Sequence, residues 1–147
     1  MRPGDPVHIK VRNLQRTVPA NVAALQRFAE RALKVCLGLH RDRRTELRNL
    51  SEISVLLISD RRMAALHSEF LGQPGPTDVI TFEHGEIFIS VATAKRHARQ
   101  FNHSLLRELE LYIVHGLLHL HGFDDRCETD ARRMKKVQEE ILEQAEL

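Results

Sequence analysis

Short strand patterns alternate with longer helical patterns along this chain, and their order is what most restricts its fold. Apolar and polar residues alternate over Val7–Val11, and branched apolar residues dominate Ile53–Ile58, so both segments are predicted to be strands. Two further strands are predicted at Val79–Phe82 and Glu86–Ser90. The connection between these two strands is short and contains Gly85, which predicts a β-hairpin.

Helical periodicity and end signals account for most of the remaining chain. Pro19 is a suitable first residue for a helix and Gly38 a suitable stop, while Ser59 and Ser104 are each placed to cap a helix start. The sequence contains no internal repeat and no long linker, so residues 1–147 are expected to form one domain. The predicted helices cover about residues 19–36, 60–70, 91–101, 105–119 and 128–146, and the predicted loops include His40–Asn49 and Gly72–Pro76.

Composition places the chain among globular proteins. Of its 147 residues, 42% are hydrophobic and 29% are charged, and a chain of this length can bury enough surface to fold without a metal or a disulfide. Cys36 and Cys127 are far apart and are expected to be free thiols in a reducing compartment. No signal peptide or membrane span is visible, so a cytoplasmic location is expected. The absence of Trp and the single Tyr argue against aromatic platforms for base stacking.

Charge is distributed unevenly along the chain. Residues 1–50 contain eleven Lys and Arg against four Asp and Glu, whereas residues 101–147 contain six against ten. This asymmetry fits a basic surface for a polyanion beside an acidic or metal-binding end, and solvated helix faces and loops explain it equally well. The candidate basic segment contains Arg41, Arg43, Arg44 and Arg48.

Three histidines fall within seven residues, at His115, His119 and His121. His115 and His119 are four residues apart in a predicted helix, so their rings lie on one face, where they can share one transition metal. Gly122 allows the chain to turn back, which brings Asp125 to face the pair. Two nitrogens and one carboxylate oxygen leave a fourth position open for hydrolytic chemistry. The alternative is that both histidines have ordinary structural roles.

Three neighbours of this motif narrow its interpretation. His121 is expected to face solvent, because it lies on a different side of the helix from His119. Cys127 is a rival for the fourth ligand position. Zinc proteases of the His-Glu-x-x-His type have a carboxylate directly after their first His, and Gly116 occupies that position here. The motif therefore argues against peptide hydrolysis.

Two separate segments resemble signatures of one family, the YbeY-type endoribonucleases, which are rRNA maturation factors of bacteria. Residues 115–124 are similar to the family pattern His-Gly-x-Leu-His-Leu-x-Gly-Tyr-Asp, with Phe123 in place of the Tyr. A second family signature is similar to Pro76–Phe82 followed by Gly85–Ser90. The resemblance extends from about Val7 to Leu142.

The resemblance implies a fold, a cofactor and a reaction. The implied fold is α+β, with a four-stranded mixed sheet covered by about five helices and a core over about residues 7–142. One Zn²⁺ per chain would be bound by His115, His119 and Asp125. The implied activity is metal-dependent endonucleolytic cleavage of single-stranded RNA, in small-subunit rRNA processing and ribosome quality control. The implied partners are rRNA, the ribosome and its assembly factors, with no membrane.

Two positions depart from the family pattern. Asp125 stands where the family has a third His ligand, so this site would consist of two His and one carboxylate. Leu71 stands where the family has an Arg that is expected to contact phosphate, and Leu cannot replace a guanidinium. Arg61 and Arg62, at the start of the same helix, are candidates to compensate for this loss.

The residues assigned to catalysis are His115, Thr77 and Asp78. Thr77 and Asp78 lie in the second signature and are candidates for contacts with the substrate or the metal ligands, and turn formation is their alternative role. RNA backbone contacts are predicted for the arginines of His40–Asn49 and for Arg61 and Arg62. The alternative function is a non-catalytic, metal-stabilised biogenesis factor that binds rRNA or the ribosome. A third is a metal hydrolase that acts on another phosphoester.

Overall fold

The computed structural model describes residues 7–39, 47–73, 75 and 77–146, and it contains every strand and helix that the sequence predicts. The first helix begins after Pro19, because the Asn21 side chain caps it by accepting a hydrogen bond from the Ala24 N–H at 3.0 Å. The elements in chain order are β1 (His8–Asn13), α1 (Val22–Leu37), a short 3₁₀ helix (Leu47–Asn49), β2 (Glu52–Ile58), α2 (Asp60–Leu71), β3 (Val79–Phe82), β4 (Glu86–Ser90), α3 (Val91–Gln100), α4 (Leu105–Leu120) and α5 (Glu128–Glu146).

The four strands form one mixed sheet in the order β1-β2-β4-β3, which confirms the expected α+β fold. β1, β2 and β4 are parallel, and β3 runs antiparallel to β4 at one edge of the sheet. The β3–β4 hairpin closes at Gly85, whose φ of 108° lies in the left-handed region. A Cβ atom there would lie 2.8 Å from the Glu52 carbonyl oxygen, so glycine allows the turn to lie against β2.

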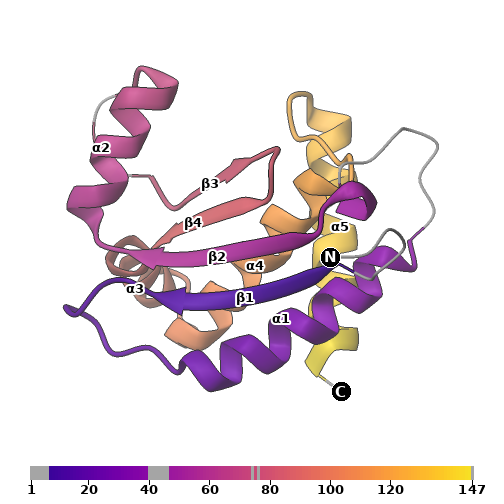
Figure 1. The fold of residues 1–147 in the computed structure, drawn as a ribbon, viewed down its shortest axis with the longest axis horizontal. Coiled ribbons are helices and arrows are strands. Elements are labelled where there is room, and N and C mark those ends of the chain that lie inside the picture. Colours follow the sequence, from indigo (N-terminus) through magenta and orange to yellow (C-terminus); the bar gives the residue numbers. More distant parts are fainter. Residues whose placement is uncertain (1–6, 40–46, 74, 76, 147) are drawn as a thin grey trace.

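The main core lies on one face of the sheet, where apolar side chains of the strands pack against α1, α4 and α5. At one end of the opposite face, α2 covers a smaller cluster of Ile58, Met63, Ile80 and Phe88. Figure 1 accordingly shows α2 standing apart from α1, α4 and α5. Because both clusters are built on the same strands, the sheet determines where α2 and β3 lie relative to α4.

α4 is the most apolar helix and lies at the centre of the main core. Ser104 caps its start as predicted, with its Oγ accepting a hydrogen bond from the Arg107 N–H at 3.1 Å. At Gly116 a Cβ atom would lie 2.7 Å from Cδ1 of Ile87, so glycine lets α4 lie directly against β4. Within the described ranges, neither α4 nor another helix is long and apolar enough to cross a bilayer.

Both cysteines are free thiols, as expected. Cys36 is fully buried in the main core, and burial raises the pKa of its thiol to about 12. Cys127 is exposed just before α5. The buried thiol is therefore a packing group without nucleophilic reactivity at neutral pH.

A carboxylate network joins the starts of α2 and α3, just beyond the ends of β2 and β4. Asp60 accepts hydrogen bonds from the hydroxyls of Ser90 and Thr93, and Arg96 donates to its other oxygen at 2.8 Å. Partial burial raises the pKa of Asp60, but these hydrogen bonds and the Arg96 charge outweigh it and lower the pKa below the ordinary value of an Asp. The network therefore holds the first turn of α2 onto the sheet.

Replacing Asp60 by Asn is expected to lower the free energy of unfolding at pH 7 by about 1–2 kcal/mol, because the amide lacks the charge that Arg96 and the hydroxyls bind. A carboxyl whose folded pKa is lowered contributes stability above its unfolded pKa and loses it as pH falls through the folded value. The difference between wild type and Asp60→Asn should therefore shrink in acid. Urea denaturation at pH 7 and below pH 4 measures it, with Glu69→Gln on the same helix as the control. A difference that is the same at both pH values would contradict this account.

Candidate metal centre

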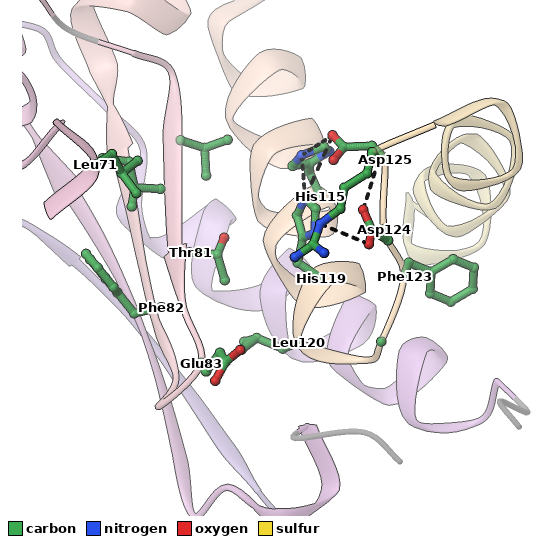
Figure 2. A pocket seen from close by; sticks show the side chains of 14 residues that line it. Leu71, Thr81, Phe82, Glu83, His115, His119, Leu120, Phe123, Asp124 and Asp125 are labelled. Atoms are coloured by element: carbon green, nitrogen blue, oxygen red, sulfur yellow. Dashed lines mark hydrogen bonds and ion pairs between the residues drawn. The ribbon is translucent and has the colours of Figure 1, made fainter. Parts of the chain in front are cut away.

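Three predicted ligands come together at the C-terminal end of α4. His115 and His119 lie one turn apart on α4, and their Nε2 atoms are 3.0 Å apart. Gly122 has a φ of 95°, and the turn at this residue directs the following segment back along the helix. As a result, Oδ2 of Asp125 lies 3.9 Å from Nε2 of His115 and 4.0 Å from Nε2 of His119 (Figure 2).

The geometry of these three groups fits one tetrahedral metal ion. Their ligand atoms all lie within 4.8 Å of one another. Two ligand atoms on a tetrahedral zinc at about 2.0 Å are ~3.3 Å apart, which lies between the 3.0 Å and 4.0 Å separations seen here. Two imidazole nitrogens and a carboxylate oxygen are also a donor set that zinc accepts while keeping a fourth position open.

Gln138 of α5 orients the first histidine, and the sequence analysis missed it. Nδ1 of His115 donates a hydrogen bond to Oε1 of Gln138 at 2.9 Å. This bond places the ring proton on Nδ1 and leaves the Nε2 lone pair directed at the other two ligands. Gln138 lies 23 residues beyond His115 in a different helix, and no local motif marks it.

The environment of His119 favours its neutral form. Partial burial and the adjacent His115 lower the pKa of His119, and they outweigh Asp125, which raises it. Burial and His115 also outweigh the hydrogen bond with the backbone of Phe123, which raises the pKa of His119. A neutral, oriented imidazole is the form that binds a metal ion.

The carboxylate next to Asp125 has a structural role instead. Oδ1 of Asp124 accepts a hydrogen bond from the Arg126 N–H at 2.8 Å, and the Arg126 side chain lies 3.3 Å from Oδ2. These contacts hold the loop between α4 and α5. Asp125, whose side chain is 48% exposed, is thus the carboxylate that is presented to the histidines.

The candidate ligands line one side of an open pocket of about 490 Å³, and β3 forms the opposite side. Residues alternate between the two faces of a strand, and Figure 2 shows Thr81 directed toward the histidines and Phe82 on the other side of β3. The Ser90 N–H donates a hydrogen bond to the Asp78 carbonyl oxygen. In this register, the backbone N–H and C=O groups of the even-numbered residues of β3 form the hydrogen bonds with β4. The backbone groups of Thr81 therefore face the open edge of the sheet along the pocket.

Thr77 and Asp78 are not among the described residues that line this pocket. Oδ1 of Asp78 accepts a hydrogen bond from the Val79 N–H at 2.8 Å, which fixes the start of β3, and Oδ2 lies 4.0 Å from Nδ1 of His97. These contacts fit the turn and strand-start role that the sequence left open as an alternative, and the catalytic role of Thr77 and Asp78 stays a prediction.

The structure describes only some of the predicted RNA-binding arginines. Arg61 and Arg62 are exposed in the first turn of α2, away from the described wall of the pocket. Arg48 lies in the short 3₁₀ helix. Arg126, which the sequence analysis did not select, lines the pocket beside the candidate ligands. The predicted residues Arg41, Arg43 and Arg44 lie outside the described part of the chain.

Two other sequence-based interpretations of this region have clear outcomes. The prediction that His121 faces solvent is wrong: the residue is 1% exposed, and its Nε2 lies 3.0 Å from the carbonyl oxygen of Leu39, just beyond the end of α1. The ring packs inward because α4 ends at Leu120 and the chain turns toward α1. Cys127 does not join the group of three ligands; its Sγ accepts a hydrogen bond from the Asp130 N–H at 3.5 Å at the start of α5.

A mixed sheet packed on a central helix with two histidines, and a carboxylate from the loop that follows, defines a protein with a His₂–carboxylate candidate metal centre. The family model described as "Endoribonuclease YbeY" matches residues 10–146. The chain therefore belongs to the YbeY family.

Several relatives and one solved structure support this assignment. The chain is 42% identical over 101 residues to Endoribonuclease YbeY of Anaeromyxobacter sp., an alignment that spans 62% of this chain and 53% of the relative. It is 36% identical over 120 residues to Endoribonuclease YbeY of Acidothermus cellulolyticus, covering 67% of this chain and 73% of the relative. A solution structure of a Thermotoga maritima protein is similar with a TM-score of 0.59 and 28% identity, over 90% of this chain and 88% of that protein.

Purified protein is expected to bind one equivalent of zinc, because three oriented ligand atoms lie within 4.8 Å of one another. His115→Ala and His119→Ala should each lower the zinc affinity by at least about 100-fold. His8→Ala, which removes an exposed histidine of β1, should leave it unchanged. Elemental analysis after dialysis against a mild chelator measures the metal content. Equal metal in wild type and His115→Ala would place the metal elsewhere.

Replacing Gln138 by Leu should lower the zinc affinity by about 10- to 100-fold, because the acceptor that orients the His115 ring is removed. Gln138→Glu keeps an acceptor at this position and should retain the affinity. Competition titration with a chromogenic chelator gives the constants. Gln144→Leu, an exposed change on the same helix, is the matched control. Similar losses of affinity in Gln138→Leu and Gln144→Leu would point to a general effect on α5.

Proposed function

We propose that this protein is a zinc-dependent endoribonuclease that cleaves single-stranded RNA. In this proposal it acts in small-subunit rRNA processing and in ribosome quality control in the cytoplasm. Its partners are rRNA, the ribosome and assembly factors, and residues 1–147 act as one domain. The observation that carries the proposal is the convergence of His115, His119 and Asp125 in an open pocket of a chain of the YbeY family.

The residues of the pocket have distinct parts in this proposal. His115, His119 and Asp125 would hold the ion, which would supply Lewis acidity for activating water and polarising a phosphoryl oxygen. Gln138 keeps Nε2 of His115 available as a ligand. The exposed Arg126 guanidinium lies at the same pocket and is placed to attract a phosphate group.

The remaining predicted residues act around this centre. We assign Asp78 a positioning role: it fixes the start of β3, and β3 forms the wall opposite the ligands. Thr77 precedes it in the same turn. The arginines at positions 41, 43, 44 and 48, together with Arg61 and Arg62, would contact the RNA backbone.

Leu71 supports a second candidate function. The position at which the family is expected to have a phosphate-binding Arg holds an apolar side chain that lines the pocket here. A protein that binds RNA and metal but cleaves slowly or not at all would be a non-catalytic, metal-stabilised biogenesis factor. Cleavage measurements separate the two functions.

Cleavage of an unstructured RNA is expected to stop when a chelator is added and to return when zinc is restored. His115→Ala should lower the rate by at least about 100-fold, because it removes one of three metal ligands. The exposed variant His8→Ala should cleave at the wild-type rate. Gel analysis of a labelled oligoribonucleotide gives the rates. Bound metal without chelator-sensitive cleavage would reject the enzyme and leave the binding factor.

The RNA affinity is expected to depend on salt through the arginines near position 43. Replacing Arg43 and Arg44 by Gln should reduce the slope of log affinity against log salt by about 0.7 for each phosphate that the variant no longer neutralises, without changing the metal content. Fluorescence anisotropy at several salt concentrations measures the slope. Arg99→Gln with Arg132→Gln removes the same charge from exposed helix positions and serves as the control. If both pairs change the slope equally, the effect is one of net charge.

A further inference from the structure

Three aromatic side chains form a continuous exposed patch beside the candidate metal centre. Phe70, at the end of α2, is 56% exposed, and the His84 side chain in the β3–β4 turn is 69% exposed. The Phe82 ring lies between them, 5.5 Å from Phe70 in an edge contact and 5.7 Å from His84 with the planes only 21° apart. We call Phe70, Phe82 and His84 the aromatic patch.

The aromatic patch is continuous with the pocket that holds the candidate ligands. Phe82 and the 53% exposed Leu71 line that pocket together with His115 and His119. Figure 2 shows Thr81 on the side of β3 that faces the histidines and Phe82 on the other side. The pocket thus passes over the open edge of β3, with the ligands on one side of this strand and the aromatic patch on the other.

The fold supports the aromatic patch from below but leaves its outer rings uncovered. Phe82 makes an edge contact of 5.8 Å with Phe88, a member of the cluster under α2. His84 is held by an interaction between its Nε2 and the Glu86 carboxylate. Among the described residues, five large apolar side chains are exposed, and two of them, Phe70 and Leu71, are adjacent here. Exposed apolar groups that cluster at a pocket are typical of a binding surface.

The charges around the aromatic patch restrict which part of an RNA strand it can bind. Its charged neighbours in the chain are carboxylates: Glu69 beside Phe70, and Glu83 and Glu86 on either side of His84. Carboxylates repel phosphate groups but not the uncharged face of a nucleobase. Exposed Phe and His rings are the side chains on which proteins stack the bases of single-stranded RNA.

We propose that the aromatic patch is a base-stacking subsite, which binds a nucleobase that flanks the phosphate at the metal centre. The inference rests on the proposed function, because the strand that it binds is RNA. It assigns Phe70 and His84 to substrate binding, with Phe82 as the supporting ring between them. The single strand would cross the open edge of β3 on its way from the ligands to the aromatic patch.

Stacking can be measured without cleavage, in the presence of a chelator. The probes are a single-stranded oligoadenylate that contains one 2-aminopurine and an oligomer of the same length that is abasic throughout. The variants are Phe70→Ala, Phe70→Leu and His84→Ala, each checked for the wild-type thermal midpoint. Phe101→Ala, which removes a ring that is 63% exposed outside the described wall of the pocket, is the control.

Phe70→Ala and His84→Ala are expected to weaken oligoadenylate binding by about 5- to 100-fold each, and to reduce the quenching of 2-aminopurine. Phe70→Leu should reduce the quenching as well, because an aliphatic side chain keeps the apolar contact but not the ring. The abasic oligomer should bind all of these proteins equally, and Phe101→Ala should bind both probes as wild type does. Removing the ring should therefore weaken binding only when the base is present. Such non-additive effects of the two changes on the binding free energy indicate a direct contact between ring and base.

Three results would overturn the inference. Phe70→Ala and His84→Ala could leave oligoadenylate binding unchanged. They could also weaken binding of the abasic oligomer by the same factor as binding of oligoadenylate. Gel filtration could instead show a wild-type dimer that Phe70→Ala dissociates, which would make the patch an interface between two copies of this chain. The proposed function can fail independently of this inference. If the protein stacks the base but shows no chelator-sensitive cleavage, the enzyme activity is rejected and the subsite is kept. If it cleaves RNA but shows no stacking, the subsite is rejected and the enzyme activity is kept.

Discussion

The close packing of α4 against β4 is the constraint on which the rest of the site depends. Gly116 lies between the two candidate histidine ligands, and any larger side chain there would collide with Ile87 of β4. Because the helix is held this closely, the free faces of His115 and His119 are fixed relative to the sheet and to β3 across the pocket. The glycine that distinguishes this motif from a protease motif is therefore also a packing requirement of the fold.

The candidate metal centre joins three parts of the chain that have separate structural supports. α4 supplies two imidazoles, the loop after Gly122 supplies Asp125, and α5 supplies the amide that orients His115. A metal bound by these groups would stabilise the folded state, because the unfolded chain does not hold them together. The opposite side of the pocket is an edge strand, whose open backbone and neighbouring rings leave room for an extended ligand. The same fold thus provides a candidate ligand set held by the core and, opposite it, an open strand edge.

The low aromatic content of the chain argued against base stacking, yet the structure leads to a proposed stacking subsite. Composition counts residues, whereas stacking depends on where a few rings are placed. Phe70, Phe82 and His84 come from α2, β3 and the hairpin turn, and only the folded sheet brings them into contact. One of the three rings is a histidine, a residue type that the content of Trp and Tyr does not reflect.

The sequence by itself determined the order of strands and helices, the caps at Ser59 and Ser104, and the candidate ligand set of His115, His119 and Asp125. These features depend on residues a few positions apart, and helical spacing and a glycine turn carry that information. The tertiary structure decided the partners of the His115 and His121 rings. Gln138 orients His115 from 23 residues away, and His121 packs toward Leu39, 82 residues away, instead of facing solvent. Contacts between distant segments form only when the core closes, so no local pattern in the chain encodes them.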